Sequence, residues 1–267
     1  MFKVRNFYDN DDVKVIDELG PLFKVVEYQR DLSVMPQNAQ MAYFADKMNV
    51  RKRQVVCDVG QSNITLQAGA MQWMLGDVHA TTGVKGVGDL FSKAVRGKVT
   101  GESAIKPEYI GNGILVLEPT YKHILLVDLS DWNHSIVLDD GLFLACDANL
   151  KHKAVMRNNV SSALAGNEGL FNLGIEGNGV VCLESKCPRE ELIEITLENE
   201  VLKIDGNMAI AWSGSLDFTV ERSGKSLIGS AASGEGLVNV YRGTGKVLMA
   251  PVGDEAMMWN SQIDMGE

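Results

Sequence analysis

GESAIKPEYIGNGILVLE (101–118), GNEGLFNLGIEGNGVVCLE (166–184) and GEGLVNVYRGTGKVLMA (234–250) are three versions of one pattern, a Gly-x-Gly step followed by an apolar run. The first glycines of the steps, Gly111, Gly177 and Gly243, recur about every 66 residues. A second motif precedes each step in the same order: LQAGAMQWM (66–74), LDDGLFLAC (138–146) and KIDGNMAIAW (203–212). Two motifs that repeat together predict three copies of one structural unit.

The glycine pairs predict the architecture of that unit. Glycine adopts positive φ at little steric cost, which a tight reversal between antiparallel strands requires. The apolar runs that follow are continuous, as in strands that are covered on both faces. We therefore expect an all-β fold (mainly), an antiparallel double-sheet roll of three internal repeats with one or two short helices. Its structural turns are expected at Gly111, Gly113, Gly177, Gly179, Gly243 and Gly245.

Two segments have the pattern of helices. Pro36 suits the first turn of a helix over residues 36–49, whose apolar side chains share one face: Met41, Phe44, Ala45 and Met48. We expect this face to pack against the sheet, and binding of a partner is the alternative. Asp89 and Gly97 suit the two ends of a second helix.

The chain divides into three parts by composition. Residues 1–52 form an N-terminal extension of short strands plus the first helix, and residues 53–252 form the triplicated β domain. Residues 253–267 are an acidic, Met-rich tail. Since no Pro-rich or Ser-rich linker interrupts the middle part, the three units are expected to form one body.

The charge of the chain argues against broad nucleic-acid binding. Asp and Glu number 35 against 25 Lys and Arg, a net charge of −10, and an acidic surface repels phosphate backbones. One basic run, Arg51 to Arg53, is interpreted as a solvated face. A second group is the candidate polyanion contact: Lys93, Arg96 and Lys98.

The chain has no apolar stretch near the roughly 18 residues of a spanning helix. Its first residues, MFKVRNFYDNDD, have the pattern of neither a signal peptide nor a transit peptide. We therefore expect a cytoplasmic protein, and the four cysteines fit a reducing compartment because three lie in apolar, strand-like runs.

Motifs for catalysis and metal binding are missing. The histidines, His79, His123, His134 and His152, lack HxH or HxxxH spacing, and no G-x-S-x-G nucleophile motif occurs. Gly224-Lys225-Ser226 is no phosphate loop, because Thr219 stands where that motif requires glycine. We expect no catalytic residue, no metal and no cofactor, and therefore a protein that is not an enzyme.

The segments AGAMQW, DDGLFLACD, GNEGLFNLGIEGNG and SGEGLVNVYRGTGKVLMAP occur in the order found in one family. Over about residues 54–252 the chain resembles the Altered Inheritance of Mitochondria 24 family, whose prokaryotic members were described as a domain of unknown function. The resemblance implies a fold similar to that of the tryptophan RNA-binding attenuation protein, and a homotrimer. It implies no reaction and supplies no catalytic residue.

Two hypotheses about function follow. The first is a non-catalytic oligomeric β scaffold or interaction protein, with itself and an unidentified protein as partners. The alternative is a small-molecule- or RNA-binding ring resembling the attenuation protein. This alternative depends on fold analogy alone, and a fold does not determine a site.

Overall fold

A computed structural model describes residues 3–81, 106–156, 171–205, 207–222 and 237–253, and this part of the chain is mainly β. One sheet contains β1 (Val13–Leu19), β2 (Phe23–Tyr28), β3 (Arg53–Asp58), β4 (Ile64–Leu66), β5 (Met71–Thr81), β6 (Glu108–Leu117), β7 (His123–Asp128), β9 (Phe143–Asp147) and β12 (Val180–Ser185). The other contains β8 (Ser135–Leu138), β10 (Lys151–Met156), β11 (Phe171–Glu176), β13 (Ile193–Asp205), β14 (Ala209–Ser213), β15 (Asp217–Arg222) and β16 (Leu237–Met249). The helices are α1 (Ala39–Lys47) and short 3₁₀ turns at Pro36–Asn38 and Leu129–Trp132.

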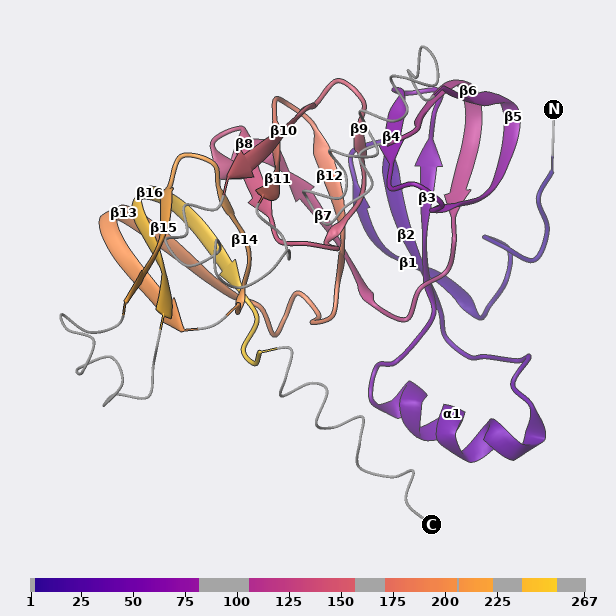
Figure 1. The fold of residues 1–267 in the computed structure, drawn as a ribbon. Coiled ribbons are helices and arrows are strands. Elements are labelled where there is room, and N and C mark those ends of the chain that lie inside the picture. Colours follow the sequence, from indigo (N-terminus) through magenta and orange to yellow (C-terminus); the bar gives the residue numbers. More distant parts are fainter. Residues whose placement is uncertain (1–2, 82–105, 157–170, 206, 223–236, 254–267) are drawn as a thin grey trace, which may run out of the picture.

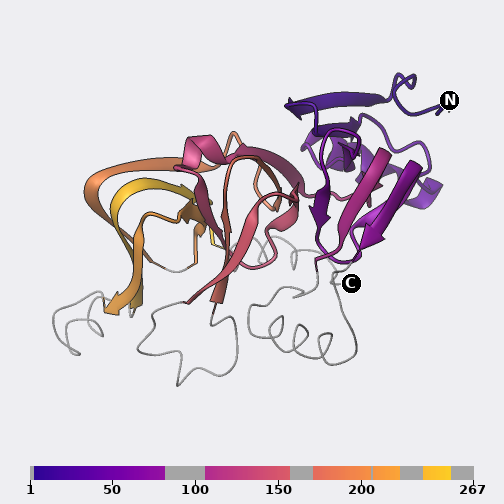
Figure 2. The ribbon, with the colours of Figure 1, turned by 90° about the horizontal axis from the view of Figure 1, so that it is seen from above.

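The two sheets are curled and antiparallel, which confirms the predicted fold class (Figure 1). The first has the order β1-β2-β3-β6-β4-β9-β12-β7 with β5 on β6, and the second β10-β11-β8-β14-β16-β13 with β15 on β16. Strands β7 to β12 are divided between the sheets, and β11 runs into β12 from one sheet to the other. This middle segment therefore joins the sheets, as the view from above also shows (Figure 2). The number of internal repeats stays a prediction.

None of the repeated glycines lies in the turn of a hairpin: two pairs lie inside strands and the middle pair lies at a bend between strands of different sheets, which differs from the expected reversals. Gly111 and Gly113 lie inside β6, and Gly243 and Gly245 lie inside β16. Gly177 and Gly179 lie where β11 leaves one sheet and β12 enters the other. Glycine is nevertheless favoured at these positions, because the backbone adopts positive φ there. The angle φ is +122° at Gly111, +133° at Gly177 and +118° at Gly243.

At Gly111 and Gly113 the backbones of β5 and β6 approach more closely than a side chain permits. A Cβ atom on Gly111 would lie 1.9 Å from the carbonyl oxygen of Asp77 on β5, and one on Gly113 would lie 2.1 Å from that of Leu75. At Gly243 the nearest atoms would be 3.8 Å away. Gly111 is thus required by both φ and space, whereas Gly243 is required by φ alone.

The core consists of apolar clusters inside the curled sheets. Residues of β2, β3, β6, β9 and β12 form one cluster, and a second gathers around Trp132, Leu138 and Leu183. Trp212 and Tyr241 belong to a third cluster in the second sheet. The cysteines Cys57, Cys146 and Cys182 are fully buried on three strands of the first sheet, as expected of small apolar side chains.

Helix α1 forms where the sequence predicts it, but its apolar face is uncovered. Figure 1 shows it beside the first sheet and outside both sheets. None of its residues is buried, and the exposed fractions of Met41, Phe44 and Met48 are 68%, 57% and 77%. The expected packing of this face against the sheet is therefore wrong. The second expected helix, between Asp89 and Gly97, lies outside the described residues.

We predict that Gly111→Ala destabilises the fold more than Gly243→Ala. Positive φ costs about 1–3 kcal/mol for a non-glycine residue and applies to both variants. The clash with the backbone of β5 adds about 1–3 kcal/mol for Gly111→Ala alone. Urea unfolding of the two variants beside wild type measures the difference. Equal losses, or a larger loss for Gly243→Ala, would contradict the close approach of β5 and β6.

Candidate functional site

One hollow in the described part of the chain lies beside helix α1. This α1 groove has a volume of about 830 Å³, within the range of about 300–1,000 Å³ typical of ligand-binding clefts. It is bounded by the loop before the helix, the helix itself, the segment after it and the link between β6 and β7. Its lining includes Arg30, Met35, Met41, Lys47, Val50 and Tyr121.

A buried ion pair fixes the segment that carries the groove. Arg53 at the start of β3 is only 2% exposed, and its Nη2 atom lies 2.8 Å from Oε2 of Glu27 on β2. The same nitrogen donates to the backbone oxygen of Asn49, 3.1 Å away, and to its side-chain oxygen, 2.9 Å away. Because Asn49 directly follows α1, this contact holds the end of the helix segment against the sheet.

Arg51 connects the same pair to the helix. Its Nη1 atom donates to Glu27 Oε1 at 3.1 Å, and its Nε atom lies 2.8 Å from Oδ1 of Asp46 on α1. The second contact is an ion pair without the alignment of a hydrogen bond. The run from Arg51 to Arg53, interpreted from the sequence as a solvated face, is therefore largely engaged in the protein. Lys52 also pairs, at 3.1 Å, with Asp31.

Most cations that line the groove are paired with carboxylates. Arg30 pairs with Asp12, Arg51 with Glu27 and Asp46, and Lys52 with Asp31. Lys52 donates a hydrogen bond to Asp31 and thereby lowers the pKa of that carboxyl. Lys47 lies over the Tyr43 ring, 5.2 Å from its centre, and pairs with no carboxylate among the described residues. The groove thus combines an apolar wall with one cation, Lys47, that is not engaged with a carboxylate of the described residues.

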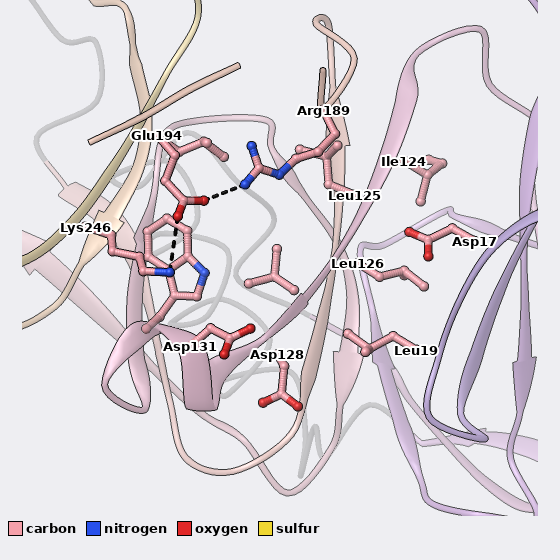
Figure 3. A pocket seen from close by; sticks show the side chains of 13 residues that line it. Asp17, Leu19, Ile124, Leu125, Leu126, Asp128, Asp131, Arg189, Glu194 and Lys246 are labelled. Carbon is pink, nitrogen blue, oxygen red and sulfur yellow. Dashed lines mark hydrogen bonds and ion pairs between the residues drawn. The ribbon is translucent and has the colours of Figure 1, made fainter. Parts of the chain in front are cut away.

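A second hollow lies between the sheets, where β1 and β7 approach β13 and β16. Figure 3 shows this cleft of about 260 Å³, with Asp17, Asp128 and Asp131 on its lower and right sides. Arg189 and Lys246 both pair with Glu194, the latter at 3.2 Å. Hydrogen bonds from Ser130 lower the pKa of Asp128. The cleft is therefore charged, and its cations are engaged with a carboxylate of its own wall.

One Cys–His pair has the residue types of a nucleophile and its base. Cys146 Sγ and His152 Nε2 are 3.2 Å apart, and the His152 ring packs edge-on against Phe143. Burial raises the pKa of the Cys146 thiol, and burial and then the nearby Lys106 charge lower the pKa of His152 to about 4. Since the thiol is buried and stays protonated, this arrangement does not activate a nucleophile.

The structure tests few of the residues singled out from the sequence. Lys93, Arg96 and Lys98 lie outside the described residues. Within the described ranges no three His, Cys, Asp or Glu side chains gather closely enough to hold a metal ion. In the same ranges no helix has the length and apolar character to cross a bilayer. Sequence reasoning missed the α1 groove, although the apolar face of the helix over 36–49 was the signal for it.

Comparison with known proteins identifies the family. The model of a family described as AIM24, mitochondrial biogenesis AIM24, matches residues 48–252. The chain belongs to the AIM24 family. The matched range begins just after α1, so it includes Asn49 and the strands from β3 to β16. Strands β1 and β2 and helix α1 precede the range.

This AIM24 chain is similar to two bacterial proteins. It is 32% identical over 193 residues to an uncharacterized protein of Streptococcus pyogenes serotype M6, covering 69% of this chain and 75% of the relative. It is also similar to a crystal structure of a protein from Streptococcus pyogenes, with 28% identity and a TM-score of 0.57. That likeness covers 80% of this chain and 94% of the other. These relatives support the fold and lend no activity.

We predict that Glu27→Gln strongly destabilises the protein. The change leaves the buried Arg53 charge without its carboxylate, which costs about 3–5 kcal/mol when a buried pair is broken. Glu18→Gln is the matched control, because Glu18 and Lys24 pair at the surface with side chains 45% and 40% exposed. Exposed pairs contribute about 1 kcal/mol or less. Urea unfolding compares the variants, and equal losses would show that Arg53 does not depend on Glu27.

Proposed function

We propose that the protein is a non-catalytic oligomeric scaffold that binds an acidic, apolar peptide segment of a partner protein in the α1 groove. The single observation that carries the proposal is the uncovered apolar face of α1 at the edge of a hollow that Lys47 also lines. An exposed apolar patch with a polar border is typical of interaction sites.

Methionine and aromatic side chains suit this kind of binding. Met35 and Met41 are 58% and 68% exposed at the groove, and Tyr43 is 58% exposed. Methionine adapts its shape to a ligand and contacts aromatic rings favourably. Lys47, which pairs with no carboxylate among the described residues, favours a negative charge on the ligand, since opposite charges attract.

Self-association is the second part of the proposal, with a homotrimer as the expected state. Further apolar side chains are exposed away from the groove: Val15, Ile16, Met74 and Val201. They lie on β1, β5 and β13 and supply surface for contacts between copies. A cytoplasmic location and the three-part division of the chain also stay proposals.

A small molecule in the cleft between the sheets is the second candidate function. The carboxylates Asp17, Asp128 and Asp131 at its wall favour a small cation over an anion. An RNA ligand has less support, because the net charge of −10 opposes phosphate contacts. The groove ranks first because it joins exposed apolar area with the unpaired cation Lys47.

We predict that the full chain binds a peptide rich in Glu, Met and Trp more tightly than one in which Lys replaces Glu. Fluorescence polarisation with labelled peptides measures both affinities. The groove variant Met41→Ser/Lys47→Glu should weaken binding of the acidic peptide about tenfold, a change of about 1.4 kcal/mol.

The matched control for this experiment is Met74→Ser/Lys14→Glu, which makes the same changes on β5 and β1. It should bind the acidic peptide as wild type does, because neither residue lines the groove. No preference between the two peptides, or equal binding by the groove and control variants, would contradict the proposal.

We predict a mass three times that of the 29.1 kDa chain in light scattering after size exclusion at micromolar concentration. Closed assemblies of identical chains are the common form of soluble oligomers. A mass of one chain at all concentrations would contradict the oligomer and leave peptide binding to be tested separately.

A further inference from the structure

Helix α1 has a second apolar surface, on the side that does not line the α1 groove. Phe44 lies on α1 and Met48 directly follows the helix, with exposed fractions of 57% and 77%, and neither borders the hollow. Met41 is 68% exposed and lies at the boundary between the groove and this surface. We call these three residues the outer stripe. Figure 1 shows α1 outside both sheets, so no strand of the described sheets covers the outer stripe.

The helical repeat separates the outer stripe from the groove. With 3.6 residues per turn, Phe44 and Met48 lie within about 60° of Met41 around the helix axis. Ala42 and Asp46 line the groove and lie roughly 100–140° away from Met41 in the opposite sense. Apolar residues spaced by three and four positions form the seam by which one helix packs against another.

Polar contacts hold the outer stripe in place. Arg53 donates hydrogen bonds to the backbone and side-chain oxygens of Asn49, which directly follows the stripe, at 3.1 Å and 2.9 Å. The amide of Met48 donates to the carbonyl oxygen of Phe44 at 3.1 Å, so both side chains lie on one helical turn. A surface that is fixed before binding loses little conformational entropy on association.

The charges of the helix favour other copies of the chain as the partner. None of the three residues of the outer stripe is charged. The acidic residue of α1, Asp46, lines the groove and pairs with Arg51 at 2.8 Å, and its basic residue, Lys47, lies over the Tyr43 ring. Outer stripes that pack against one another therefore bury no charge, and burial of an unpaired charge is the main cost of a wrong contact.

The exposed area distinguishes an assembly of two copies from one of three. An aromatic or similarly large side chain offers about 200 Å² for burial, so the exposed fractions of the outer stripe correspond to roughly 400 Å² per copy. Two stripes would bury about 800 Å², whereas specific complexes bury about 1,200–2,000 Å². Three stripes would bury about 1,200 Å², which reaches that range.

We propose that the outer stripes of three copies pack together, so that the α1 helices meet at the symmetry axis of a homotrimer. This inference rests on the self-association in the proposed function, and it names the surface that joins the copies. Because the α1 groove lies on the other side of each helix, the contact leaves the groove of each copy open to a peptide.

Light scattering after size exclusion of the full chain tests the contact. Phe44→Ser/Met48→Ser should raise the concentration at which half of the trimer dissociates by about tenfold or more, because most of the outer stripe is lost. The matched control is Tyr43→Ser/Met35→Ser, since these two side chains are each 58% exposed but line the groove. The control should dissociate as wild type does. All four residues are exposed, so far-UV circular dichroism should show both variants folded.

The outcomes separate this inference from the proposed function. An unchanged trimer in Phe44→Ser/Met48→Ser would overturn the inference and leave self-association standing. Equal weakening by the stripe variant and the control would likewise overturn the assignment to the outer stripe. A wild-type chain that is a monomer at all concentrations would overturn self-association itself, and the inference with it.

Cross-linking tests whether the outer stripes meet. The four native cysteines are buried, so a cysteine introduced at the surface reacts first with a short bis-maleimide. Phe44→Cys should give covalent pairs of chains, whereas Tyr43→Cys should give few. The two positions are adjacent and equally exposed, at 57% and 58%, but lie on different sides of the helix. Equal yields, or pairs from Tyr43→Cys alone, would overturn the proposal.

A lipid surface is the alternative occupant, and it fits the outer stripe less well. Helices that lie on membranes carry several basic residues beside their apolar face, and α1 has a single lysine. The wild-type chain should therefore not float with vesicles of anionic lipid. Flotation that Phe44→Ser/Met48→Ser abolishes would assign the outer stripe to a membrane surface and overturn the proposal.

Discussion

The pairing of β5 with β6 brings two backbones closer together than a side chain permits. At Gly111 a Cβ atom would lie 1.9 Å from the carbonyl oxygen of Asp77, so β5 and β6 can run together only with glycine there. At Gly177 the bend carries the chain from the second sheet into the first. The pairing of β5 with β6 and the passage of the chain from β11 to β12 therefore depend on these glycines.

A buried ion pair positions the chain segment that contains helix α1. Arg53 is held by Glu27 on the neighbouring strand and by Asn49 after the helix, so the helix segment is tied to the sheet through polar contacts. Because these contacts fix the helix at its end, its apolar face is not needed for attachment and stays uncovered. The groove beside α1 follows from this division of roles.

The sequence predicts the all-β double-sheet fold, the helix over 36–49 and the buried cysteines, because apolar periodicity and glycine spacing are local properties. It does not distinguish a hairpin turn from a continuous strand at Gly111 or Gly243, since glycine with positive φ occurs in both. An amphipathic helix shows that one face is apolar but not what covers it, so the exposure of Met41 was missed. The pairing of Arg53 with Glu27 was also missed, since the two are distant in sequence and meet only across β2 and β3.

The reactivity of the four buried thiols reports on local opening of the folded protein. Cys57 and Cys182 belong to the cluster of the first sheet, and Cys146 and Cys187 belong to the cluster beside it. All four are buried, so an alkylating reagent reaches each one only when the structure around it opens. The rate of alkylation at each cysteine therefore measures the local opening equilibrium of one half of the molecule without any added label.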